Sequence, residues 1–424
     1  MWFAALLSSI CFEGLGRKFI PSLSASALYF TKDVVLLWGL IGFGVRVDAK
    51  RTARKLYGGF ALVLLFAFLW TVAECANPRQ ASFPLALLGL RAYWLWWIAP
   101  LVVASALRDD LARRRAVRVL AVVTIVVAAQ ACFQFAAPAD APINEYAWGA
   151  EEMGIAVVHD TSRVRVTSTF SFITGFGDFC IIALAVLVPL GLGDRPGRSV
   201  RTIALVAIAA IATALPMSGS RAPLVLGALV VIAGMWGAGY LRPRAGLRLI
   251  AASVVAVLMS AFVVPEAGDG VRARFGYSDT EGRFADALQV LPPVAMIAND
   301  YPMLGSGTGM QQNARIALGV ATEWDTELEP GRHLVELGAP GYLLVWVARV
   351  GLVVALLRAA RSLKRSGRLP LRGLALALAA VTMLQNITFD HIGQALYFIC
   401  VGLVLQGATP AVTPKGARRS EVGS

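Results

Sequence analysis

Apolar stretches long enough to cross a lipid bilayer recur along nearly all of this 424-residue chain. A helix needs about 20 mostly apolar residues to cross the hydrocarbon core of a membrane, and such stretches leave few other structures open to a chain. The sequence therefore predicts an all-α protein, a polytopic transmembrane helical bundle of about 11–12 spans. The expected spans are 1–12 (short), 24–45, 56–74, 84–107, 117–135, 167–193, 202–218, 222–240, 247–264, 339–357, 371–389 and 393–409.

The basic residues indicate the orientation of the spans. The net charge is +13, but the excess lies in short arginine clusters between apolar stretches, which argues against nucleic-acid binding. Basic loops are typical of the cytoplasmic side of a membrane protein. The loops and tail expected there contain 25 of the 39 Lys and Arg residues, and they are 46–55, 108–118, 194–201, 241–248, 358–372 and 410–424.

The opposite face receives a long acidic loop and all three histidines. From Pro265 to Pro340 the chain has eleven acidic residues against five arginines. This length is enough for a small helical cap rather than a bare loop. The expected division is 1–264, N-terminal spans; 265–338, the outer loop or cap; 339–409, C-terminal spans; and 410–424, a cytoplasmic tail.

Three arginines stand at the outer ends of expected spans. They are Arg163 and Arg165 in SRVRVTSTF and Arg221 in PMSGSRAP. A guanidinium group is a planar, permanently charged fork that suits phosphate oxygens, so two such groups around one cavity can hold a pyrophosphate without a metal. The alternative is that they pair with the acidic loop or with lipid headgroups.

A further charged group precedes the span at 339–357. In TELEPGRHLVELG, a helix would place Glu329, Arg332, His333 and Glu336 on one face, with Glu327 just before it. Carboxylates beside an imidazole can supply a general base for a sugar hydroxyl, and an arginine there can bind a leaving phosphate. The same spacing also fits a surface ladder of salt bridges.

Ionisable residues inside expected spans are costly and therefore candidates for function. Lys32 and Asp33 are neighbours that can neutralise each other, and Arg349 is expected to extend its head group to the inner boundary. Arg91 fits either an anchor or a functional residue, and Asp178 needs a partner that the sequence does not identify.

Motifs of nucleotide and metal chemistry are absent from the sequence. It has no Walker A sequence, no HExxH and no cysteine–histidine set, so no cofactor is expected. GSGTGMQQN, at 305–313, lacks the strand-before and helix-after context of a phosphate loop, and we interpret it as a tight turn.

Several short motifs, in this order, resemble the bacterial O-antigen ligase/polymerase superfamily. They are RVTSTF with Arg165, SGSRAP with Arg221 and PMLGSGTGMQQN in the late loop, and the layout of a dozen spans with a large late loop is also similar. The N-terminal FEGLGRKFIPSLSASALYFTKDVVLL resembles a divergent branch of exopolysaccharide polymerase-like proteins. The resemblance covers nearly the whole chain.

This resemblance implies a metal-independent, inverting glycosyltransferase of the bacterial inner membrane. It would polymerise or transfer undecaprenyl-pyrophosphate-linked polysaccharide on the periplasmic side, with a glycan or lipid acceptor, among membrane lipid and beside the polysaccharide export machinery. Arg165 and Arg221 would hold the pyrophosphate, with Arg163 or Arg332 in support.

The family's late histidine is displaced in this chain. Its place, counted back from the ELGxxG stretch, falls near Glu327, whereas His333 stands six residues later. Either Glu327 acts instead, His333 reaches the same place from the next helical turn, or the chemistry is altered or lost. Two other functions remain open: a lipid-linked glycan transporter or flippase, although the chain has no visible repeats, and an inactive scaffold of an export complex.

Overall fold

A computed structural model describes most of the chain. The described residues are 1–20, 22–44, 50–51, 53–54, 57–107, 109–145, 156–157, 163–193, 198–240, 301–324, 326 and 328–408. The expected span at 247–264, the first part of the expected cap, and the tail lie outside them.

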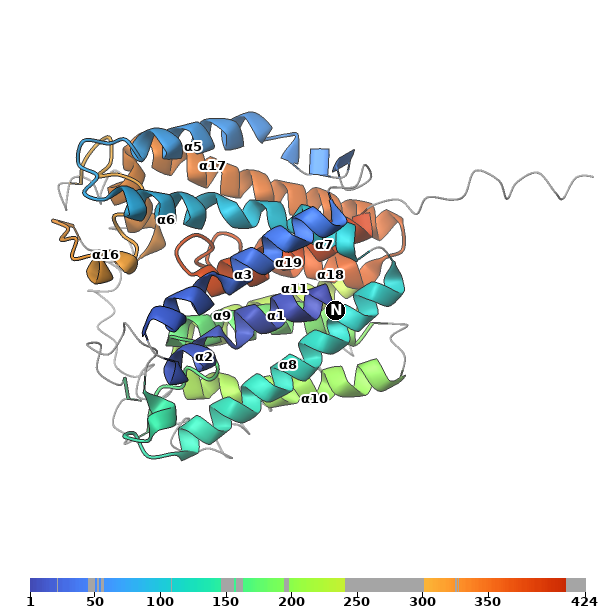
Figure 1. Ribbon diagram of the computed structural model, residues 1–424. Helices are drawn as coiled ribbons and strands as arrows, with labels where there is room; N and C mark the ends of the chain where they lie inside the picture. Colours follow the sequence, from blue (N-terminus) through green and yellow to red (C-terminus); the bar gives the residue numbers. More distant parts are fainter. Residues whose placement is uncertain are drawn as a thin grey trace, which may run out of the picture.

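The described residues form helices joined by turns, as the apolar pattern predicts (Figure 1). The first half contains α1 (Trp2–Cys11), α2 (Glu13–Phe19), α3 (Ser22–Phe43), α5 (Ala61–Glu74), α6 (Phe83–Trp94), α7 (Ala99–Ala106) and α8 (Asp110–Ala136). The second half contains α9 (Ile173–Val186), α10 (Arg198–Ala214), α11 (Arg221–Ala238), α16 (Ala314–Ala317), α17 (Glu329–Arg365), α18 (Leu369–Val381) and α19 (His391–Ala408). A π-turn, Leu187–Gly191, extends α9.

Seven helical stretches among the described residues are long and apolar enough to cross a membrane. They are Phe83–Ala106, Asp110–Ala136, Ile173–Gly191, Arg198–Ser218, Arg221–Ala238, Glu329–Arg365 and His391–Ala408. Three shorter apolar helices, α1, α5 and α18, lie among them. The chain is therefore a multi-pass helical membrane protein, and the predicted fold class is confirmed.

Helices α9 and α19 form the centre of the bundle, and nearly all of their residues are buried. Helix α19 packs on α7 and α9, α11 packs on α18, α8 on α10, and α17 on α5. The contact between α11 and α18 is close because Gly237 faces Gly373, where an added Cβ would come within 2.5 Å of the Gly373 Cα. Small residues at such a crossing let two backbones approach in a membrane, where apolar burial alone does not drive association.

The basic segments gather at one end of the bundle. Arg113, at the start of α8, donates to the Gln406 side chain at the end of α19 (3.0 Å), and Arg368, before α18, donates to the Gly407 carbonyl. The N-terminus lies at the same end in Figure 1, and α2 and α16 lie at the opposite end. Two of the expected cytoplasmic segments, 108–118 and 358–372, therefore meet at this end through their described residues.

The prediction of an unbroken span at 371–389 is wrong. Helix α18 ends at Val381, and the chain is non-helical from Thr382 to Asp390. The Asn386 side-chain oxygen accepts hydrogen bonds from the backbone N–H groups of Thr388 (3.3 Å), Phe389 (2.8 Å) and Asp390 (3.2 Å). Asparagine competes with helix hydrogen bonds in this way, and hydropathy does not detect it.

The described part of the late loop, 301–324, 326 and 328–338, contains turns, the four-residue α16 and the first part of α17. The tight turn predicted at GSGTG is confirmed, because Gly305, Gly307 and Gly309 have φ values of 89°, 106° and 94°. The loop packs between α6 and α17: an added Cβ on Gly309 would lie 2.1 Å from the Leu85 carbonyl oxygen, and the Ser306 N–H donates to the Val335 carbonyl (2.8 Å). The loop is thereby fixed against the first part of α17.

Candidate functional site

Arg165 and the segment that carries Arg221 lie together at the end of the bundle that carries α2. The Arg165 guanidinium donates from Nε to the Ser218 carbonyl (3.1 Å) and from Nη2 to the Ser220 hydroxyl (2.5 Å). Arg221 follows directly as the first residue of α11. The two arginines expected to bind pyrophosphate therefore share one location, although more than fifty residues separate them in the chain.

The local sequence explains this contact. A short 3₁₀ turn, Leu215–Ser218, ends at Gly219, whose φ of 61° lies in the left-handed region that favours glycine. The Arg165 side chain passes over that glycine, where an added Cβ would lie 3.1 Å from its Cγ. Backbone pairing holds the arginine segment in place, since the Val166 N–H donates to the Met217 carbonyl at 3.2 Å.

Lys18, in α2, helps to hold the same segment. Its Nζ donates to the Thr167 hydroxyl (3.1 Å) and to the Ile143 carbonyl (3.2 Å). Burial lowers the pKa of Lys18 to about 8, although the nearby Glu145 carboxylate acts in the opposite direction. Lys18 thus joins α2 to Ile143 and to Thr167, which lies two residues after Arg165.

The Arg163 side chain lies against the C-terminal end of α8. It donates to the carbonyls of Ala136 (3.1 Å) and Phe135 (3.4 Å), and its guanidinium lies over the Phe135 ring. These carbonyls belong to the last turn of a helix, where basic side chains bind favourably. Through these contacts Arg163 stabilises the end of a helix, and its expected support of a phosphate site stays a prediction.

Helix α17 reverses direction at Gly338, whose φ of 62° and ψ of −173° are non-helical. Residues at increasing distances on either side of this glycine contact each other: Leu337 packs on Gly341, the His333 and Trp346 rings lie 6.3 Å apart, and Glu329 binds Arg349. These contacts define two antiparallel helical arms, Glu329–Leu337 and Ala339–Arg365. We call the first of these the re-entrant arm, because it packs back along the second.

His333 lies on the re-entrant arm and is fully buried. Its Nε2 lies 3.2 Å from the Thr388 hydroxyl and 4.0 Å from Glu329 Oε1. The rings of Phe389 and Tyr93 lie 5.2 Å and 5.6 Å from the imidazole. His333 therefore has a hydroxyl and a carboxylate beside the same nitrogen.

Arg349 does not extend to the inner boundary, and that prediction is wrong. The residue is 2% exposed and donates from Nη2 to Glu329 Oε2 (2.6 Å) and to the Gln385 carbonyl (3.1 Å). The reversal at Gly338 brings Glu329 back beside it, and a buried guanidinium is stable when it is paired and hydrogen-bonded.

The other charged residues of this arm, Arg332 and Glu336, form hydrogen bonds with the late loop. Arg332 donates to the Thr326 carbonyl (2.9 Å) and lies over the Phe389 ring. The buried Glu336 accepts from the Gln311 N–H (2.7 Å). The expected surface ladder is therefore excluded for Glu329, His333 and Glu336, which are all buried. Glu327 lies outside the described residues.

Lys32 and Asp33 do not neutralise each other. Lys32 forms its ion pair with Glu13 of α2, and Asp33 with Arg91 of α6 at 2.5 Å. Arg91 also donates to the Tyr29 hydroxyl (3.0 Å). These pairs join α2, α3 and α6.

Asp178 obtains its partners from the non-helical segment after α18. Its carboxyl group lies beside Asp390 and Gln385, and an added Cβ on Gly393 would lie 2.1 Å from its Oδ2. Its neighbour Gly177 packs on Pro223, in the first turn of α11. Asp178 therefore lies between the start of α11, beside Arg165 and Arg221, and the Gln385–Thr388 segment.

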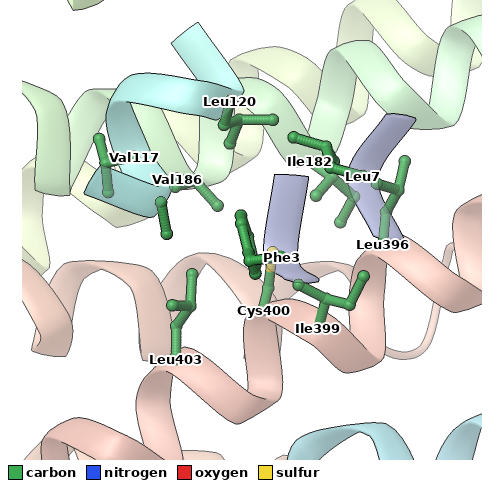
Figure 2. A pocket seen from close by; sticks show the side chains of 11 residues that line it. Phe3, Leu7, Val117, Leu120, Ile182, Val186, Leu396, Ile399, Cys400 and Leu403 are labelled. Atoms are coloured by element: carbon green, nitrogen blue, oxygen red, sulfur yellow. The ribbon is translucent and has the colours of Figure 1, made fainter. Parts of the chain in front are cut away.

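The described part of the bundle contains a cavity in its apolar core and another beside Arg349. The first, between α1, α8, α9 and α19, is lined by Phe3, Leu7, Cys400 and other apolar side chains and has no charged group (Figure 2). The second contains Arg349 and Thr388 in its wall, together with Tyr93, Trp94, Trp97, Val345, Ala348, Ile387 and Phe398. The second adjoins the His333 cluster.

Sequence reasoning missed Thr388, Gln385 and the pairing of Glu329 with Arg349. The spacing of Glu329 and His333 predicts that they share one helical face. Thr388 lies in an expected span, where the sequence does not mark it as a functional residue. Among the described residues, no group of three His, Cys, Asp or Glu side chains is placed to hold a metal ion.

Comparison with known proteins adds no assignment. No protein-family model matches the chain, and no curated protein matches it.

Proposed function

We propose that this membrane protein polymerises or transfers an undecaprenyl-pyrophosphate-linked polysaccharide on the periplasmic side of a bacterial inner membrane. The observation that supports this best is the contact of Arg165 with Ser218 and Ser220, which places its guanidinium next to the start of α11 and Arg221. A chain of contacts leads from there through Gly177 and Asp178 to the segment that contacts His333.

The arginines would bind the donor. The N-terminus of α11 carries a partial positive charge, and Arg165 and Arg221 add two guanidinium groups at that point. Together they provide charge and hydrogen-bond donors for a pyrophosphate without a metal. Binding should strengthen as the leaving pyrophosphate gains charge, which favours the transition state.

The acceptor side would use His333 or Glu327 as the base. The base takes the proton of an acceptor hydroxyl, the oxygen forms a bond to the anomeric carbon of the donor, and the carbon–oxygen bond to the pyrophosphate breaks. The electron pair leaves with the lipid pyrophosphate, and the configuration at the anomeric carbon is inverted. His333 has the hydroxyl of Thr388 3.2 Å from its Nε2, which suits proton transfer.

The test is to delete the gene and complement it with wild type, Arg221→Ala or Arg358→Ala. Arg358 is exposed on α17 at the basic end, so its variant is a matched loss of one charge. Surface and lipid-linked glycans are then separated by size. Loss of long glycan with build-up of single lipid-linked repeats, in the deletion and Arg221→Ala strains, supports a polymerase, and accumulation of full-length lipid-linked chains supports a ligase. Normal glycans in the deletion strain contradict the proposal.

A second candidate, a transporter of lipid-linked glycans, is favoured by one observation. Helix α17 is interrupted at Gly338, and the chain is non-helical at Thr382–Asp390, inside an expected span. Broken helices with ionisable groups are typical of transporter binding sites. Fluorescent lipid-linked oligosaccharide in proteoliposomes would distinguish the two: transport by the purified protein without a change in glycan length supports the transporter.

A further inference from the structure

The His333 cluster has hydrogen-bonding capacity that the described residues do not use. Glu329 Oε1, His333 Nδ1 and Arg349 Nε are buried and have no hydrogen-bond partner there. The exposed fractions of these residues are 7%, 0% and 2%. Buried polar atoms are nearly always paired with protein or with ordered water, so this cluster has free capacity to bind a polar group or a water molecule.

The second cavity leads to this cluster. Thr388 and Arg349 belong to its wall, and the other lining residues are aromatic or aliphatic. Thr388 is also the residue whose hydroxyl lies 3.2 Å from His333 Nε2. One hydroxyl group thus connects the cavity with the imidazole, and Glu329 Oε1 lies 4.0 Å from the same nitrogen.

Arg349 fixes the relative positions of these groups. Its Nη2 donates to Glu329 Oε2 on the re-entrant arm and to the Gln385 carbonyl on the segment that carries Thr388. The other oxygen of Glu329 remains directed to the histidine side. The guanidinium therefore holds the carboxylate and the hydroxyl beside the same imidazole nitrogen, Nε2.

We propose that Thr388, His333 and Glu329 form a proton-transfer chain for the acceptor hydroxyl, that the cavity beside Thr388 admits this hydroxyl, and that Arg349 positions Glu329. The proposal rests on the proposed function and assigns the acceptor side of the same site. It also assigns to Glu329 the role of the carboxylate that stabilises the protonated His333.

The acceptor hydroxyl gives its proton to Thr388 Oγ1 while Thr388 gives its own proton to His333 Nε2, so Thr388 is unchanged. The acceptor oxygen bonds to the anomeric carbon, and the pyrophosphate leaves with the electron pair of the broken bond. The imidazolium that forms is stabilised by the charge of the Glu329 carboxylate, whose Oε1 lies 4.0 Å from Nε2.

The experiment uses membranes that contain the full chain, incubated with lipid-linked glycan extracted from the deletion strain. Rates of glycan extension are compared for wild type, Thr388→Val, Thr388→Ser and Glu329→Gln, with Glu323→Gln, an exposed residue of the same loop, as the matched control. We expect Thr388→Val and Glu329→Gln to lower turnover at least 100-fold, with little change in the KM for the donor, because general-base catalysis contributes about 10²–10⁴-fold. Thr388→Ser should retain most of the rate.

A pH profile separates positioning from mere packing. The charged and titratable groups that face His333 are Glu329 and Arg332 on its own arm, Arg349 on the other arm, and Tyr93 on α6. Activity should fall as His333 becomes protonated, and the residual activity of Glu329→Gln should fall at lower pH than that of wild type, since the imidazolium loses its carboxylate. Arg349→Lys should move the profile in the same direction by less.

Wild-type turnover in Thr388→Val, or a Glu329→Gln profile identical to that of wild type, overturns this inference while the proposed function stands. Normal glycan in the deletion strain overturns both. Where Glu329→Gln is lost from the membrane, the comparison of Thr388→Val with Thr388→Ser decides, because Thr388→Val replaces the hydroxyl by a methyl group and Thr388→Ser keeps the hydroxyl.

Discussion

Glu329 and Arg349 meet at 2.6 Å, although they lie on opposite arms of α17 and the chain reverses between them at Gly338. Both side chains are almost completely buried. The pair closes the helical hairpin at the end away from the glycine, so the position of His333 depends on it. Removing one member of such a pair leaves an uncompensated buried charge.

We therefore expect Arg349→Met to lower the free energy of unfolding by about 3–5 kcal/mol, whereas the double variant Glu329→Gln/Arg349→Met should regain a large part of it. The measurement is thermal denaturation of the purified protein in detergent. Arg358→Met, an exposed position on the same helix, is the control and should change little. A double variant that is less stable than Arg349→Met would contradict the interpretation.

Gly338 should be the least replaceable residue of this hairpin. Its backbone conformation is open essentially to glycine alone, and an added Cβ would lie 2.3 Å from the Met303 carbonyl oxygen. Gly367 has a similar φ of 72° with no atom within 4 Å of an added Cβ. We expect Gly367→Ala to cost about 1–2 kcal/mol and Gly338→Ala to cost more, because it adds a clash with backbone. Equal melting temperatures for the two variants would contradict this explanation.

The sequence predicts the helical class and the ends of most spans because apolar length and basic loops have direct physical causes. It could not predict the reversal of α17, which depends on one glycine and on a loop that packs against it. For the same reason the sequence predicts the wrong position for Arg349, at the inner boundary. Its partner Glu329 lies on the other side of the reversal, and hydropathy carries no information about pairing.

The candidate site was predictable only in part. Arg165 and Arg221 were chosen as phosphate ligands from their chemistry, and their shared location depends on the turn at Gly219. Helical spacing indicates His333, but Thr388 lies in an apolar stretch that hydropathy assigns to a span. The break there comes from the hydrogen bonds of a single asparagine.

That asparagine gives a further prediction. Asn386→Ala should remove the acceptor of three backbone N–H groups and lower stability by about 1–2 kcal/mol, comparable to loss of a helix cap. Asn386→Asp keeps the oxygen and should lose less. Thermal denaturation measures both, with the exposed Asn313→Ala as control. If Asn386→Asp is as unstable as Asn386→Ala, the oxygen is not what holds the segment.

The orientation of the chain can be tested with cysteine labelling. Ser366, at the basic end of α17, and Ala321, in the late loop, are both exposed in the bundle. Because basic loops are retained in the cytoplasm, we expect Ser366→Cys to lie inside and Ala321→Cys outside. Cys75 and Cys132, the two native cysteines that are not buried, are first replaced by serine.

A membrane-impermeant maleimide is then added to intact spheroplasts and, separately, to permeabilised ones. Ala321→Cys should react in both, and Ser366→Cys only after permeabilisation, while the background protein stays unlabelled. Reaction of Ser366→Cys in intact spheroplasts would place the basic end outside. It would also move the Arg165 and His333 groups to the cytoplasmic side, where a periplasmic glycan could not reach them.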